Sequence, residues 1–167
     1  MTSPVRLVPV LFGALVLHQS LFVTLRIGDA HPQLMLLVAV AGGLLAGSER
    51  GALIGFAAGM LADLFVETPL GLSALTFALV GFVVGSAQTG IVHTAWWISP
   101  LTALVASFTG VVLYGLLGAL IGQAHFVSLH LLVLAGGVGA MNAVLAAPVV
   151  RVMGWALGGS DEKAYAR

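Results

Sequence analysis

The chain has 167 residues, of which 60% are hydrophobic and only 7% are charged, with six basic and six acidic side chains. Soluble domains carry about 25% charged residues, so this chain has too few polar groups to cover a water-facing surface and is predicted to be an all-α membrane protein. The absence of cysteine excludes thiol catalysis, zinc-thiolate sites and disulfides, and without a basic run nucleic-acid binding has no support.

Six transmembrane helices are predicted, because about 20 apolar residues span a hydrocarbon core about 30 Å thick. The apolar N-terminal stretch lacks a convincing signal-peptide cleavage site, so it is interpreted as a retained first span. A tight reversal is expected at Ser48-Glu49-Arg50, since one helix from Pro32 to Val66 would measure roughly 50 Å. The predicted spans are Leu7–Leu25, Pro32–Gly47, Gly51–Val66, Leu72–Ala87, Pro100–Ile121 and Leu129–Val150.

These spans are expected to form a single six-transmembrane-helix bundle over residues 1–158, followed by a short cytoplasmic tail over residues 159–167. An even number of spans puts both termini on the same side of the membrane. The positive-inside rule makes that side cytoplasmic, because it carries five of the six basic residues and only Arg26 lies opposite. The five are Arg6, Arg50, Arg151, Lys163 and Arg167.

A four-residue repeat of small side chains runs through the third predicted span. Gly47, Gly51, Gly55 and Gly59 form it, and Gly81 and Gly85 repeat the pattern in the fourth span. Such a strip lets another helix approach backbone to backbone, and packing of this kind holds membrane helices together. We therefore expect these six glycines to be helix-packing residues inside the bundle rather than contacts with a partner chain.

Asp63 and Glu67 continue the same four-residue spacing, and Asp63 is the only carboxylate well inside an apolar stretch. A charged side chain costs about 2.5 to 3.5 kcal/mol at a bilayer centre, and less near the end of a span. Three interpretations of Asp63 stay open. The carboxylate contacts a partner, it pairs internally with Arg26, or it is protonated and bonded to a neighbouring backbone carbonyl.

No catalytic or metal-ligating constellation is recognisable. An intramembrane aspartyl protease needs two carboxylates that share a proton, and a serine protease needs a base and an oxyanion hole beside its serine. His31, His125 and His130 have no ligands at tight metal spacing. The chain is therefore expected to be no enzyme, to hold no cofactor or metal, and to act by binding other membrane proteins.

The stretch Arg50–Phe65, followed by Pro69-Leu70-Gly71 and an apolar span that ends in Gly81-Phe82-Val83-Val84-Gly85, resembles the bacterial rod shape-determining protein MreD family. The resemblance lies in the order of a glycine-spaced helix ending in Asp, a Pro-x-Gly turn and a second glycine-containing helix. It implies a non-enzymatic scaffold or regulatory subunit of the cell-elongation (rod) complex, multi-pass in the inner membrane. It also implies a fold similar to the S-component of energy-coupling-factor transporters.

The partners that the resemblance implies are MreC as a direct one, with RodA, a penicillin-binding transpeptidase and MreB in the wider complex that supports peptidoglycan synthesis. Membrane lipid surrounds the bundle. The candidate partner-binding residues are those of the predicted outer edge, Asp63, Glu67, Pro69, Leu70 and Gly71.

The alternative function is the substrate-binding S-component of an energy-coupling-factor vitamin transporter, which has a similar size and span count. Its outward loops would have to hold a polar vitamin, and here they are short and carry few aromatic or convergent polar residues. A small ligand that copurifies would favour the transporter, whereas copurification of MreC would favour the scaffold.

Overall fold

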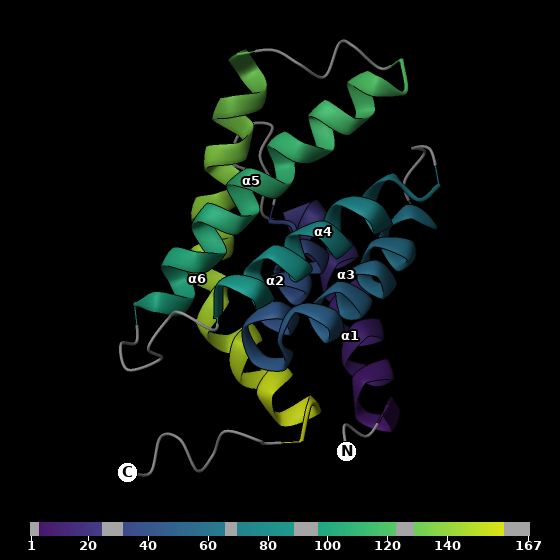
Figure 1. Ribbon diagram of the computed structural model, residues 1–167, viewed down its shortest axis with the longest axis vertical. Coiled ribbons are helices and arrows are strands. Elements are labelled where there is room, and N and C mark those ends of the chain that lie inside the picture. The colour runs from purple at the N-terminus through teal and green to yellow at the C-terminus, as the bar shows by residue number, and fades with distance from the viewer. Residues whose placement is uncertain (1–3, 25–31, 66–69, 89–96, 123–128, 159–167) are drawn as a thin grey trace.

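The computed structural model describes residues 4–24, 32–65, 70–88, 97–122 and 129–158, and these residues form six α-helices (Figure 1). The predicted all-helical fold with six helices is confirmed. The helices are α1 (Pro4–Thr24), α2 (Leu34–Ala46), α3 (Ser48–Asp63), α4 (Leu72–Ala87), α5 (Ile98–Leu120) and α6 (Leu129–Ala156).

Among the described helices, α5 and α6 are long and apolar enough to cross a membrane. With 23 and 28 residues, they measure roughly 35 and 42 Å at 1.5 Å per residue. The apolar parts of α1, α2 and α4 are shorter. In Figure 1, α2, α3 and α4 lie side by side, while α5 and α6 extend beyond them at the top of the view.

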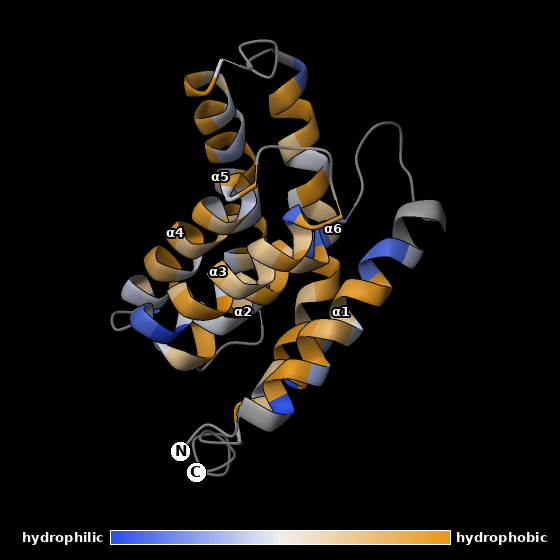
Figure 2. Cartoon of the chain, turned by 90° about the vertical axis from the view of Figure 1, so that its right-hand side faces the viewer, coloured by the Kyte–Doolittle hydropathy of each residue, from blue (hydrophilic) through white to orange (hydrophobic). Residues whose placement is uncertain are grey.

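The centre of the bundle is α2. Eleven of its thirteen residues are buried, and it contacts each of the other five helices. Burial on all sides is what an all-round apolar sequence predicts for a helix. The outward faces of the surrounding helices are themselves largely apolar (Figure 2), as expected of a surface that meets lipid rather than water.

A single residue, Gly47, joins α2 to α3. Its φ of +84° lies in a region that glycine adopts readily and other residues rarely do. The prediction of a reversal at Ser48-Glu49-Arg50 is therefore wrong by one residue step, because those three residues form the first turn of α3. Glu49 suits that place, since a negative side chain is favoured at the positive end of a helix dipole.

The last helix, α6, continues past the predicted end at Val150 to Ala156, with Arg151 exposed on its surface. Its final turn contacts the beginning of α1, where the guanidinium carbon of Arg6 lies 5.5 Å from the centre of the Trp155 ring. The beginning of the first helix and the end of the last therefore meet at one end of the molecule.

Candidate functional site at the α3–α4 pair

Glycines bring the backbones of α3 and α4 into direct contact. A Cβ added to Gly55 would overlap the carbonyl group of Phe77, and one added to Gly59 would overlap the backbone of Ala74. Moving up α3 by one turn thus moves the contact back along α4 by about one turn, which is the register of an antiparallel pair. Any side chain at these two positions would force the helices apart.

Three backbones meet nearer the bend at Gly47. A Cβ added to Gly51 would lie 2.6 Å from the Cα of Gly43 in α2 and 2.7 Å from the carbonyl oxygen of Gly81 in α4. A Cβ on Gly85 would overlap the backbone of Gly47, although a Cβ on Gly47 itself would meet nothing within 4 Å. Gly47 is therefore a turn residue, and its backbone packs directly against Gly85.

Gly43 is a packing residue that the sequence analysis missed. A Cβ added to it would lie 2.5 Å from the carbonyl oxygen of Gly81. The signal was present, because Gly43 stands four residues before Gly47 and extends the repeat by one step into α2.

Asp63, the last residue of α3, caps the beginning of α4. The backbone N–H groups of Gly71 and Ala74 donate to its Oδ2 at 2.8 and 3.3 Å, and the N–H of Ser73 donates to its Oδ1 at 3.3 Å. The first N–H groups of a helix have no acceptor within it, and the helix dipole favours an anion at this end. The carboxylate therefore satisfies three donors that the apolar interior would otherwise leave unbonded.

The turn before α4 makes this cap possible. Gly71 has a φ of +98°, which strains any other residue, and its N–H makes the shortest of the three bonds to Asp63. Asp63 is only 2% exposed as a result. Leu70, the residue before Gly71, is 73% exposed. The carboxylate is held inside the protein while the leucine beside it faces outward.

This use of Asp63 differs from the three interpretations drawn from the sequence. Both carboxylate oxygens accept bonds from the protein's own backbone, so within the described residues Asp63 serves as an internal cap, and a contact with a partner stays a proposal. Arg26, with which Asp63 was predicted to pair, lies outside the residues that the structure describes. Glu67 and Pro69 also lie outside them.

A second buried polar group joins three segments of the bundle. The amide of Asn142 in α6 is fully buried. Its Oδ1 accepts a bond from the N–H of Gln33 at 3.2 Å, and its Nδ2 donates to the carbonyl oxygen of Gln33 at 3.3 Å and to the Ser107 hydroxyl at 2.9 Å. The residue that precedes α2 is thereby attached to the middle of α6 and to α5.

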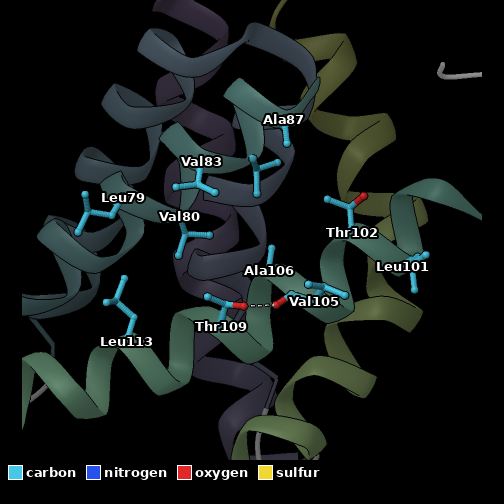
Figure 3. A pocket seen from close by; sticks show the side chains of 11 residues that line it. Leu79, Val80, Val83, Ala87, Leu101, Thr102, Val105, Ala106, Thr109 and Leu113 are labelled. Carbon is cyan, nitrogen blue, oxygen red and sulfur yellow. Dashed lines mark hydrogen bonds between the residues drawn. The ribbon is translucent and has the colours of Figure 1, made fainter. Parts of the chain in front are cut away.

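An apolar groove of about 370 Å³ lies between α4 and α5 (Figure 3). Leu79 and Val83 line one wall, and Val105 lines the other. Its hydroxyl groups are those of Thr102 and Thr109, and the Thr109 hydroxyl donates to the Val105 carbonyl of its own helix at 2.9 Å. The groove therefore offers contact area for aliphatic groups and few partners for a polar molecule.

The described residues contain no group of three histidine, aspartate or glutamate side chains placed to hold a metal ion. Among the described buried polar side chains, Asp63, Thr76 and Asn142 bond to backbone groups, and Asn142 also bonds to Ser107. What this arrangement supports physically is close helix packing and the presentation of an apolar outer surface.

A family model described as the rod shape-determining protein MreD matches residues 3–154, nearly the whole chain. The comparisons with curated proteins and with solved structures give no match. The family match and the apolar helices together indicate a membrane protein with a part in determining rod shape. The matched range contains the glycine-packed pair α3–α4, the Asp63 cap and the Gly71 turn. The chain belongs to the MreD family of rod shape-determining proteins.

Proposed function

We propose that this chain is a non-enzymatic membrane scaffold or regulatory subunit of the bacterial cell-elongation complex, which binds MreC and thereby supports peptidoglycan synthesis. The family match over residues 3–154 carries this proposal. Two features of the described residues support it. The buried Asp63 and Asn142 side chains bond internally. Apart from Glu49 and Arg50 in the first turn of α3, the large exposed side chains of α3 and α4 are apolar, as a surface for other membrane helices requires.

The proposed placement is the inner membrane, with all six helices crossing it and both termini in the cytoplasm. The contact between Arg6 and Trp155 supports a shared side for the two ends of the described chain. The short length of α2, roughly 20 Å for 13 residues, suits this placement because protein surrounds it, so its ends need not reach water. RodA, the transpeptidase and MreB belong to the wider complex in this proposal.

Labelling of introduced cysteines tests the topology without a background signal, because the chain has no cysteine of its own. A reagent confined to the outside is expected to modify Thr68→Cys and to miss Ser160→Cys, and permeabilisation should make the second site reactive. Modification of Ser160→Cys alone in intact cells would reverse the proposed orientation.

The MreC contact is proposed at the outer edge that Asp63, Glu67, Pro69, Leu70 and Gly71 form. Leu70 offers its exposed side chain to a partner, whereas Asp63 and Gly71 act indirectly by holding the turn in place. Leu64 and Phe65, which follow the last residue of α3, are also exposed, at 65% and 59%. These three exposed apolar side chains flank the segment between α3 and α4, and they are proposed as the area that a partner's membrane helix would cover.

Leu70→Ser is expected to lower the recovery of MreC at least about fivefold, because an apolar side chain central to an interface is often worth more than 1 kcal/mol. Leu53→Ser is the matched control. Leu53 is 70% exposed on α3, and its replacement should leave MreC recovery unchanged. Copurification from native membranes measures both, and equal recovery with the two variants would remove Leu70 from the interface.

The transporter alternative has less support. The groove between α4 and α5 carries two hydroxyl groups, one of them bonded within its own helix, and a polar vitamin needs several convergent donors and acceptors. The same pulldown separates the two functions, since a small ligand bound to the purified chain would favour transport.

A further inference from the structure

We infer that Arg6, Arg151 and Trp155 form a binding site for the phosphate headgroup of an anionic phospholipid. The site lies at the end of the bundle where α1 begins and α6 finishes. It goes beyond the scaffold function proposed above and does not depend on MreC, because it concerns a different end and different residues of the molecule.

The first part of the site is the contact between α1 and α6. The guanidinium carbon of Arg6 lies 5.5 Å from the centre of the Trp155 ring, within the range of a cation–π interaction. Trp155 is 61% exposed, and Arg6 is exposed as well. The tryptophan therefore holds the arginine at a defined position and leaves the guanidinium edge open to the surroundings. A side chain that is already ordered loses less entropy when it binds a ligand.

The second part is Arg151, which stands four residues before Trp155 on α6 and is exposed. Residues four apart lie on the same face of a helix, with Cβ atoms about 5 to 6 Å apart. Arg151 therefore lies on the same face of α6 as Trp155, whose ring Arg6 contacts from α1. Two guanidinium groups on one surface repel one another, and an anion bound between them is attracted to both.

The charges of the described residues leave this pair without an acidic counterpart. The two acidic side chains described are Glu49, in the first turn of α3, and Asp63, the buried cap of α4. No ion pair joins Arg6 or Arg151 to either of them. Within the part of the chain that the structure describes, this surface is therefore positive and complementary to an anion.

The surroundings favour a phospholipid over a free anion. Tryptophan and arginine together are typical of the depth at which headgroups lie, and the arginine fork matches two phosphate oxygens. Val8 on α1 and Val152 on α6 are 65% and 50% exposed close to the two arginines in sequence. They offer apolar surface to acyl chains, which inorganic phosphate lacks.

The test uses the full chain in neutral detergent, titrated with short-chain phosphatidylglycerol, with phosphatidylcholine of the same tails, or with inorganic phosphate. Native mass spectrometry counts the bound molecules. The wild-type chain is expected to prefer phosphatidylglycerol to phosphatidylcholine at least about tenfold. The double variant Arg6→Gln/Arg151→Gln should bind phosphatidylglycerol about thirtyfold more weakly, and Arg151→Gln alone about fivefold more weakly.

Two variants separate a site from general attraction. Arg50→Gln removes an exposed arginine from the first turn of α3 and should keep the wild-type affinity. Arg6→Lys keeps the charge over the ring and should stay within about threefold of the wild type. The melting temperature in lipid-free detergent checks the fold of each variant. If the double variant does not fold, the test rests on Arg151→Gln alone, because Arg151 is exposed and its replacement should leave the fold intact.

Unchanged binding by Arg151→Gln and the double variant would overturn the inference. So would an equal loss in Arg50→Gln, which indicates diffuse attraction, or equal affinity for inorganic phosphate, which indicates an adventitious ion only. Because MreC recovery is a separate measurement, failure here leaves the scaffold proposal to its own test.

Discussion

Gly55→Ala is expected to destabilise the protein by at least about 3 kcal/mol, even though it adds a single methyl group. The new Cβ would overlap the carbonyl group of Phe77, and backbone atoms cannot rotate aside as a side chain can. Overpacking in ordinary cores costs about 1 to 3 kcal/mol. Separation of α3 from α4 at Gly55 would also disturb the contacts at Gly51 and Gly59. Gly55→Leu should be still less stable and poorly accumulated.

The matched control is Gly136→Ala in α6, where an added Cβ would meet nothing within 4 Å. Because alanine favours helix over glycine by up to about 1 kcal/mol, this variant should be neutral or slightly more stable than the wild type. Thermal unfolding in one detergent, together with abundance in membranes, compares the two. The same melting temperature for Gly55→Ala and the wild type would refute the close contact with Phe77.

Asp63→Ala is expected to cost at least about 3 kcal/mol of stability. The change leaves the N–H groups of Gly71, Ser73 and Ala74 without their acceptor, and a buried donor without a partner costs about 1 to 3 kcal/mol. Exposed helix caps are worth about 0.5 to 2 kcal/mol, and this cap is buried. The stability of Asp63→Asn should lie between those of the wild type and Asp63→Ala, because the amide keeps one acceptor oxygen and places its NH₂ group against a backbone donor.

Thr109→Ala is the control for this series, since its hydroxyl bonds within its own helix and its loss should change stability by no more than about 0.5 kcal/mol. Melting and MreC recovery are measured on the same preparations. An Asp63→Ala protein that melts like the wild type but no longer retains MreC would make the carboxylate a partner contact and contradict its role as a cap.

The four-residue spacing of the glycines predicted which face of the third helix and which face of the fourth helix carry small residues, because periodicity along one helix is a local property of the sequence. The spacing did not predict at which glycine the chain turns from one helix into the next. Gly47 fits the four-residue spacing, yet it has a φ of +84° and lies between helices. The polar run Ser48-Glu49-Arg50 predicted the turn there, since polar residues usually mark the ends of membrane helices. The spacing of residues along the sequence does not reveal a positive φ, so the bend was predicted one residue away from its actual position.

The sequence also singled out Asp63 but not its partners. The N–H groups that it binds belong to residues eight to eleven positions later, on the far side of a turn whose course depends on Gly71. In the sequence, a carboxylate that accepts bonds from the next helix looks the same as a carboxylate that binds a partner protein. The distinction needs the distance between two helices, which no local pattern contains.

The bonds between Gln33 and Asn142 join residues 109 positions apart, and this separation constrains the order of events during synthesis. Translation delivers α2 to the membrane long before α6 emerges from the ribosome. Until then the N–H of Gln33 must rely on water, on lipid headgroups or on an insertase, whereas its carbonyl oxygen already accepts a bond from the N–H of Leu37. A nascent chain that stops before Asn142 can bury the glycine-packed helices but cannot close the bundle over α2. Truncated chains of this kind should therefore be recognised and degraded by membrane proteases, and residence in the insertion machinery should last until the final helix is complete.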